Sequence, residues 1–157
     1  MLINLRVRLK IPDAEAATVK NTLVRRLGYG NVLGDVKKER IFSIQVDSGD
    51  PEELARAFAR ELVNENKESH KVLIDRLEFE EGYVPVKVAL HIEDGEAIAI
   101  RERLRRRLGY QNVVDVKKAT VWKLYFRLLK PEAEITAREI AEKLLINPHK
   151  DSYEIVM

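Results

Sequence analysis

Two basic clusters are the residues of this chain best placed to bind another molecule. Each cluster precedes a Leu-Gly-Tyr sequence and is followed by a lysine pair, Lys37-Lys38 or Lys117-Lys118. The cluster members considered as contacts are Arg25, Arg26, Arg106 and Arg107. Arginine at a helix C-terminus complements the helix dipole, which is one interpretation. The other is that these cations meet an acidic partner surface or a phosphate group.

Tyr29 and Tyr110 follow the two clusters and are expected to cover the helix ends, or to anchor an interface. The sequence offers little for catalysis. It has no cysteine, no glycine-rich loop before a Lys-Ser/Thr pair, and only three scattered histidines, His70, His91 and His149. No catalytic, metal-binding or cofactor-binding residue is therefore predicted, and an activity of the chain's own stays open.

The clusters occur twice because the sequence is repeated. Residues 25–38, RRLGYGNVLGDVKK, return as residues 106–118, RRLGYQNVVDVKK, about 80 positions later. The unit is too long for a solenoid repeat, whose period is roughly 20–50 residues. We interpret the chain as repeat 1 (residues 1–79) and repeat 2 (residues 83–157), joined by a short linker at 80–82.

Both repeats carry the same pattern of elements. An alternating strand near residues 5–11 or 86–92 is followed by Asp13 or Asp94, which are placed to cap a helix. The helical stripes Ala16-Val19-Leu23-Leu27 and Ala97-Ile100-Leu104-Leu108 end at Gly28 and Gly109, which suit a left-handed C′ position.

Two further strands, a second helix and a final strand complete each repeat. In repeat 1 the strands are expected at 32–38 and 41–46, the helix from Asp50-Pro51, and the last strand near 71–79. In repeat 2 the landmarks are Pro131 and Asn147-Pro148. The order β-α-β-β-α-β predicts the α+β class, as two ferredoxin-related units with antiparallel sheets and helices on one face.

A single unit of this kind is small and leaves a sheet face or edge exposed. We therefore expect the repeats to pack as an intramolecular pseudo-dimer. Exchange of segments between the repeats and further self-association are both left open. With 45% hydrophobic and 34% charged residues, the composition is typical of a soluble globular protein, and the expected location is the cytoplasm. No apolar stretch is long enough for a membrane span, and a net charge of +2 does not favour nucleic acid.

A further motif lies near the C-terminus. Residues 143–148 read KLLINP and residues 151–155 read DSYEI, with Asn147, Pro148 and Tyr153 as their distinctive members. Together with the capped helix ending in Leu-Gly-Tyr, this motif resembles the PurS family, the small subunit of formylglycinamidine ribonucleotide synthase. Repeat 1 matches less well, because Asn64 is followed by Glu65 instead of proline.

The resemblance implies a non-catalytic subunit that pairs by exchanging segments. Members of the family join a glutaminase, PurQ, to a synthetase, PurL, so that ammonia from glutamine reaches the synthetase site. ATP and Mg²⁺ are then expected on PurL and no cofactor on this chain. The alternative is a tandem ferredoxin-like module that binds RNA or a small ligand, although Phe42 and Trp122 are unaccompanied as stacking aromatics.

Overall fold

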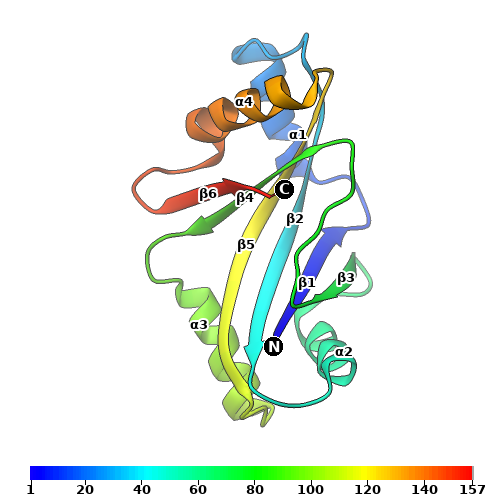
Figure 1. The fold of residues 1–157 in the computed structure, drawn as a ribbon, viewed down its shortest axis with the longest axis vertical. Coiled ribbons are helices and arrows are strands. Elements are labelled where there is room, and N and C mark those ends of the chain that lie inside the picture. Colours follow the sequence, from blue (N-terminus) through cyan, green and yellow to red (C-terminus); the bar gives the residue numbers. More distant parts are fainter. Residues whose placement is uncertain (157) are drawn as a thin grey trace. The chain divides into compact units, whose positions relative to one another are not determined.

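The computed structural model describes residues 1–156, in which strands and helices alternate (Figure 1). The strands are β1 (Leu2–Leu9), β2 (Leu33–Val46), β3 (Glu68–Ile74), β4 (Val84–Leu90), β5 (Val113–Phe126) and β6 (Asp151–Ile155). The helices are α1 (Ala14–Asn21), α2 (Pro51–Leu62), α3 (Gly95–Glu102) and α4 (Lys130–Ile140). The chain is of the α+β class. Within residues 1–156, every helix is too short or too polar to cross a membrane.

Local capping signals fix the helix starts as the sequence predicts. Asp13 accepts hydrogen bonds from the N–H groups of Glu15 and Ala16, the second and third residues of α1, and Asp94 accepts from the corresponding second and third residues of α3. Asp50 accepts from the Glu53 N–H, and a proline is the first residue of α2. Gly28 and Gly109 adopt φ values of 80° and 78°, which confirms the predicted left-handed ends.

Three helices end in a wider turn that the sequence does not reveal. α1, α3 and α4 continue into the π-turns η1 (Thr22–Arg26), η2 (Arg103–Arg107) and η3 (Ala141–Leu145). The N–H of Leu27 donates to the carbonyl of Thr22, five residues back. Such a turn contains one extra residue, so side chains four positions apart across it no longer lie on the same face of the helix. Leu27 and Leu108, predicted as buried, are consequently each 40% exposed.

Hydrogen bonds join the strands in the order β3-β1-β2-β5-β4-β6, with β2 and β5 side by side as the two long strands (Figure 1). The chain forms two compact units, and each unit contains half of each long strand. Unit 1 comprises residues 1–10, 40–77 and 93–119, and unit 2 comprises residues 11–39, 78–92 and 120–157. The compact units thus divide the chain differently from the two sequence repeats.

Unit 1 combines the strands of repeat 1 with a helix of repeat 2. β1 pairs antiparallel with β2 and with β3. Leu5 from β1 and Phe58 from α2 are buried in one core with Ile100 and Leu104, which come from repeat 2. Leu104 has no exposed surface. The core of this unit is therefore incomplete without a helix from the other repeat.

Unit 2 shows the reciprocal arrangement. β4 pairs antiparallel with β5 and β6. Val86 from β4 and Ile140 from α4 share a core with Ala16, Leu23 and Leu33, which come from repeat 1. Each repeat gives its first helix and the start of its long strand to the unit built on the other repeat, so the segment exchange implied by the family resemblance is present.

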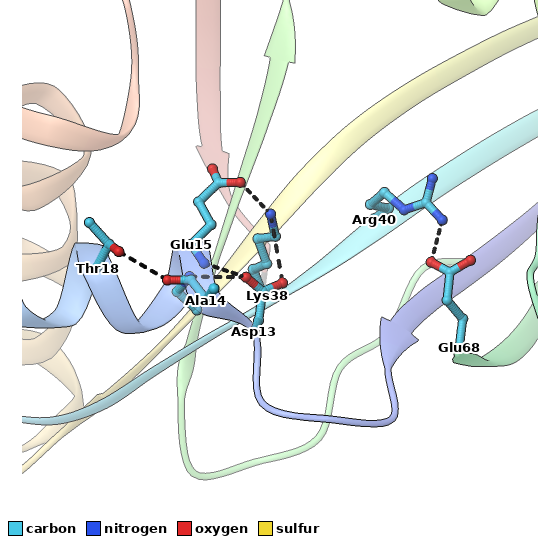
Figure 2. A network of polar contacts seen from close by, with 8 residues as sticks. Asp13, Ala14, Glu15, Thr18, Lys38, Arg40 and Glu68 are labelled. Carbon is cyan, nitrogen blue, oxygen red and sulfur yellow. Dashed lines mark hydrogen bonds and ion pairs between the residues drawn. The ribbon is translucent and has the colours of Figure 1, made fainter. Parts of the chain in front are cut away.

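The predicted pair of strands at 32–38 and 41–46 is wrong, because β2 is one strand across both segments. The polar residues between them resemble a turn but have charged partners. Glu39 pairs with Lys123 at 2.7 Å, and both side chains are buried. Arg40 pairs with Glu68 (Figure 2). Since these charges are compensated, no turn is needed to bring them to water.

The segment that connects the repeats also differs from the prediction. The last strand of repeat 1 is β3, ending at Ile74 instead of near Phe79, and β4 begins at Val84. Residues 75–83 lie outside any strand or helix, with positive φ at Asp75 and Gly82. The two strands are therefore not continuous.

Candidate partner interface

Tyr29 is held at the end of the first helix of repeat 1. Gly28 turns the chain so that the Tyr29 N–H donates to the carbonyl of Leu23 at 3.0 Å, and the side chain is only 8% exposed. Its ring lies in the core of unit 2, against the last helix of repeat 2. The prediction that the tyrosine covers a helix end is confirmed, but a helix of the other repeat provides part of its surroundings.

The hydroxyl of Tyr29 belongs to a three-residue polar cluster with Glu139 and Lys143, which we call the tyrosine cluster. The hydroxyl donates to Glu139 Oε1 at 2.5 Å. Lys143 Nζ donates to that same Oε1 at 2.8 Å and to the hydroxyl at 3.1 Å, and it lies 5.5 Å from the centre of the Tyr29 ring. The cluster connects the end of η1 to the α4–η3 helix.

The cluster shifts the pKa of each member in a direction set by its contacts. Burial, followed by the hydrogen bond to Glu139, raises the pKa of Tyr29. The hydrogen bond from Lys143, followed by that from Tyr29, lowers the pKa of Glu139. The bond to Glu139 likewise raises the pKa of Lys143. All three groups therefore keep their neutral-pH forms over a wider pH range.

Tyr29→Phe is expected to weaken unit 2 at neutral pH and to reduce its sensitivity to alkali. The lost hydroxyl leaves the Glu139 carboxylate with one hydrogen-bond partner fewer. Because the Tyr29 pKa is raised, the contribution of its protonated hydroxyl is complete below about pH 10, the ordinary tyrosine value, and is lost as pH rises through the raised value. Denaturant unfolding from pH 8 to pH 11 measures both effects.

Tyr153→Phe is the matched control for that experiment. Burial and the hydrogen bond to Glu142 raise the pKa of Tyr153 too, so its shift has the same direction at another place in the unit. The Lys143–Glu139 pair persists in both variants. A stability difference between wild type and Tyr29→Phe that stays constant up to pH 11 would contradict the role given to this hydroxyl.

Tyr110 occupies the equivalent helix end in unit 1 but has different neighbours. Its N–H donates to the carbonyl of Leu104 at 2.9 Å, as Tyr29 does to Leu23. Its ring meets Phe58 of α2 edge-on, with ring centres 5.4 Å apart. In unit 1 the tyrosine at the helix end therefore makes an aromatic contact, whereas in unit 2 the corresponding tyrosine belongs to the tyrosine cluster. The ends of η1 and η2 are not chemically equivalent.

The four candidate arginines all lie in η1 or η2 and are exposed. Arg106 Nε pairs with Glu102 at 2.8 Å, but its side chain remains 84% exposed. Exposed pairs of this kind contribute little to stability. The arginines thus form two cationic surfaces, one at the end of the α1–η1 helix and one at the end of the α3–η2 helix.

The lysine pairs that follow have structural partners. Lys38 Nζ lies 2.6 Å from Glu15 and 3.7 Å from Asp13, the cap of α1 (Figure 2). Lys118 Nζ lies 2.8 Å from Glu96, which follows the cap of α3. These lysines join each long strand to the start of a helix. Because these lysines are already paired with carboxylates, they contribute little positive charge to an anion site formed by the nearby arginines.

Asn147 organises the turn between η3 and β6. Its N–H donates to the Asp151 carboxylate at 2.8 Å, and its side-chain oxygen accepts from the His149 N–H at 3.0 Å. In unit 1, Asn64 makes the corresponding bonds with Glu68 and Asn66 at 3.0 and 3.2 Å. Both turns form although only repeat 2 has Pro148, so the proline is not required for the turn.

Beyond this turn the repeats diverge. Tyr153 of β6 lies opposite Val88, and His70 of β3 lies opposite the equivalent Val7. The Tyr153 hydroxyl donates to Glu142 Oε1 at 2.8 Å. Tyr153, Glu142 and the tyrosine cluster therefore all involve the α4–η3 helix, which carries more tyrosine–carboxylate contacts than α2 does in the described residues.

Comparison with protein families places the C-terminal motif in context. Residues 83–157 match the family model described as PurS: Phosphoribosylformylglycinamidine (FGAM) synthase. Residues 83–157 are a PurS domain. The match covers Arg106, Arg107, Tyr110, Asn147, Pro148 and Tyr153 and supports a role in FGAM synthase, in purine biosynthesis. Among curated proteins, no relative matches the chain.

The PurS domain includes functional candidates that sequence reasoning missed. Glu139 and Lys143 are four residues apart in sequence, a spacing typical of an ordinary exposed helical ion pair. Their contact with Tyr29 joins positions 110 and 114 residues apart, and no local pattern indicates it. Within residues 1–156, no group of three or more His, Asp or Glu side chains is arranged to hold a metal ion.

Proposed function

We propose that this chain is the non-catalytic assembly subunit of FGAM synthase, acting in the cytoplasm. In this role it bridges a glutaminase, PurQ, and a synthetase, PurL, and supports ammonia transfer between them. The observation that carries the proposal is the PurS match of repeat 2, combined with the reciprocal exchange of helices between the two repeats. Such an exchange is what fusion of a segment-swapped dimer would produce.

The surfaces proposed to meet PurQ or PurL are the helix ends and the C-terminal segment. They contain Arg25, Arg26, Tyr29, Arg106, Arg107, Tyr110, Asn147, Pro148 and Tyr153. The tyrosine cluster occurs in unit 2 only, which favours distinct contacts for the two repeats. Tyr29 and Tyr110 contribute chiefly by shaping these surfaces, since both pack against their own units.

The alternative of an RNA-binding module finds little support in the aromatic residues. Phe42 and Trp122 are only 3% and 5% exposed. Arg40 lies over the Phe42 ring and Lys38 over the Trp122 ring. Base stacking requires an accessible aromatic face, so these two rings are poor platforms for it.

A pull-down of the tagged chain from its source cell is expected to retain two proteins, a glutaminase and an ATP-dependent synthetase. Tyr153→Ala should reduce the recovery of at least one of them, because Tyr153 distinguishes the proposed repeat-2 contact. Its strand-equivalent variant, His70→Ala, is the control. Mass spectrometry of the retained proteins and a thermal unfolding curve for each variant provide the measurement.

Two outcomes would contradict the proposal at different levels. Recovery of neither catalytic protein by the wild-type chain would refute the assembly role. Equal recovery by both variants, or losses that only follow a lower Tm, would refute the specific contact at Tyr153 and leave the assembly role standing.

A further inference from the structure

Unit 2 contains a cavity of about 590 Å³ that the assembly role does not use. It lies among the start of α4, residues 79–85, the end of β5 and the end of the described chain. Its walls include Tyr83, Leu124, Phe126 and Ile155. The volume falls in the range of roughly 300–1,000 Å³ that is typical of small-molecule sites.

The start of α4 forms the helix wall of the cavity, and this helix begins farther from its C-terminal turn than α2 does. Leu129, which caps α4, lies 18 residues before Asn147, whereas Asp50, which caps α2, lies 14 residues before the equivalent Asn64. Ala133 belongs to the core of unit 2 and also lines the cavity.

A large side chain is missing on the strand side of the cavity. In unit 1 the Val46 N–H donates to the carbonyl of Met1, and the Met1 side chain packs against the core. The β4–β5 register, in which Val84 lies opposite Leu124, places Gly82 at the position equivalent to Met1. A Cβ built on Gly82 would meet no atom within 4 Å. A glycine in place of the large Met1 side chain thus leaves space on the strand side of the cavity.

The charges around the cavity determine what it can accept. Its lining includes the carboxylates of Glu80, Glu81 and Glu134 and one ammonium, that of Lys130. The Tyr83 hydroxyl donates to Glu80 Oε1 at 3.1 Å. Apolar walls with an acidic rim attract a cation that has an apolar body and repel a phosphate ester.

We infer that this cavity binds a small organic cation, with its apolar body inserted between Ala133 and Phe126 and its amine near Glu134. The inference is independent of the assembly role. It distinguishes unit 2 from unit 1, where Met1 occupies the position of Gly82.

Amide NMR titration of the full chain with phenethylamine tests this site, and 3-phenylpropionate, which has an apolar body of similar size and the opposite charge, is the matched probe. The amine is expected to shift the amides of residues 79–85 and 124–134, and the acid to bind at least about fivefold more weakly. Ala133→Leu, which adds volume at the helix wall of the cavity, should weaken amine binding about tenfold or more.

Glu134→Gln provides a second variant that keeps the cavity volume. It should bring the amine and acid affinities closer together, and raising the salt concentration should do the same. Absence of localised shifts, equal binding of amine and acid to the wild type, or undiminished amine binding by a folded Ala133→Leu variant would each overturn the inference. If Ala133→Leu does not fold, the probe pair and Glu134→Gln decide.

Discussion

The isolated PurS domain, residues 83–157, is expected to form a dimer, whereas the full chain folds without a second copy. Residues 93–119 of this fragment belong to unit 1, and the unit-2 core loses Ala16, Leu23, Leu33 and Val36 when repeat 1 is removed. Each fully buried large apolar side chain contributes roughly 1.5–3 kcal/mol, so the loss is comparable to a typical domain stability of about 5–15 kcal/mol.

A second fragment can replace what repeat 1 supplies. Ala97, Leu104, Val113 and Val116 match the missing residues in the repeat alignment and are buried in unit 1. The fragment cannot readily use its own copies, because β5 is one continuous strand from Val113 to Phe126. Sedimentation over a concentration series should show a dimer that unfolds on dilution. A stable folded monomer would show that exchange is not needed.

The sequence predicts the local features of this fold well. Asp13, Asp94, Asp50, Gly28 and Gly109 act where capping and turn chemistry place them, because each makes contacts within a few residues of its own position. The β2 strand was predicted as two because the partner of Glu39 is Lys123, which is distant in sequence. A tertiary ion pair here overrides a local turn signal.

The candidate site was less predictable for the same reason. Tyr29 could be singled out from the repeated Leu-Gly-Tyr sequence, but its partners Glu139 and Lys143 belong to the other repeat. The cavity had a signal in the sequence, since aligning the repeats sets Gly82 against Met1. The difference between glycine and methionine predicts a cavity only once the structure shows that this position borders the unit-2 core.

Glutamine-dependent FGAM synthesis by the two catalytic subunits is expected to fall by roughly 100-fold or more when this chain is withheld. Bringing components together raises their effective concentration to the millimolar range and can increase avidity by 10²–10⁴. If the chain bridges the two subunits as proposed, its absence lets ammonia leave the glutaminase into bulk solution. The sequence contains no cysteine to serve as a glutaminase nucleophile, so the chain alone should not replace PurQ.

The most direct test of the bridging role is the ratio of glutamine-dependent to ammonia-dependent turnover, measured with PurL, PurQ and ATP in the presence and absence of this chain. The account predicts that adding the chain restores turnover with glutamine and changes turnover with an ammonium salt little. A ratio that is the same with and without the chain would contradict it.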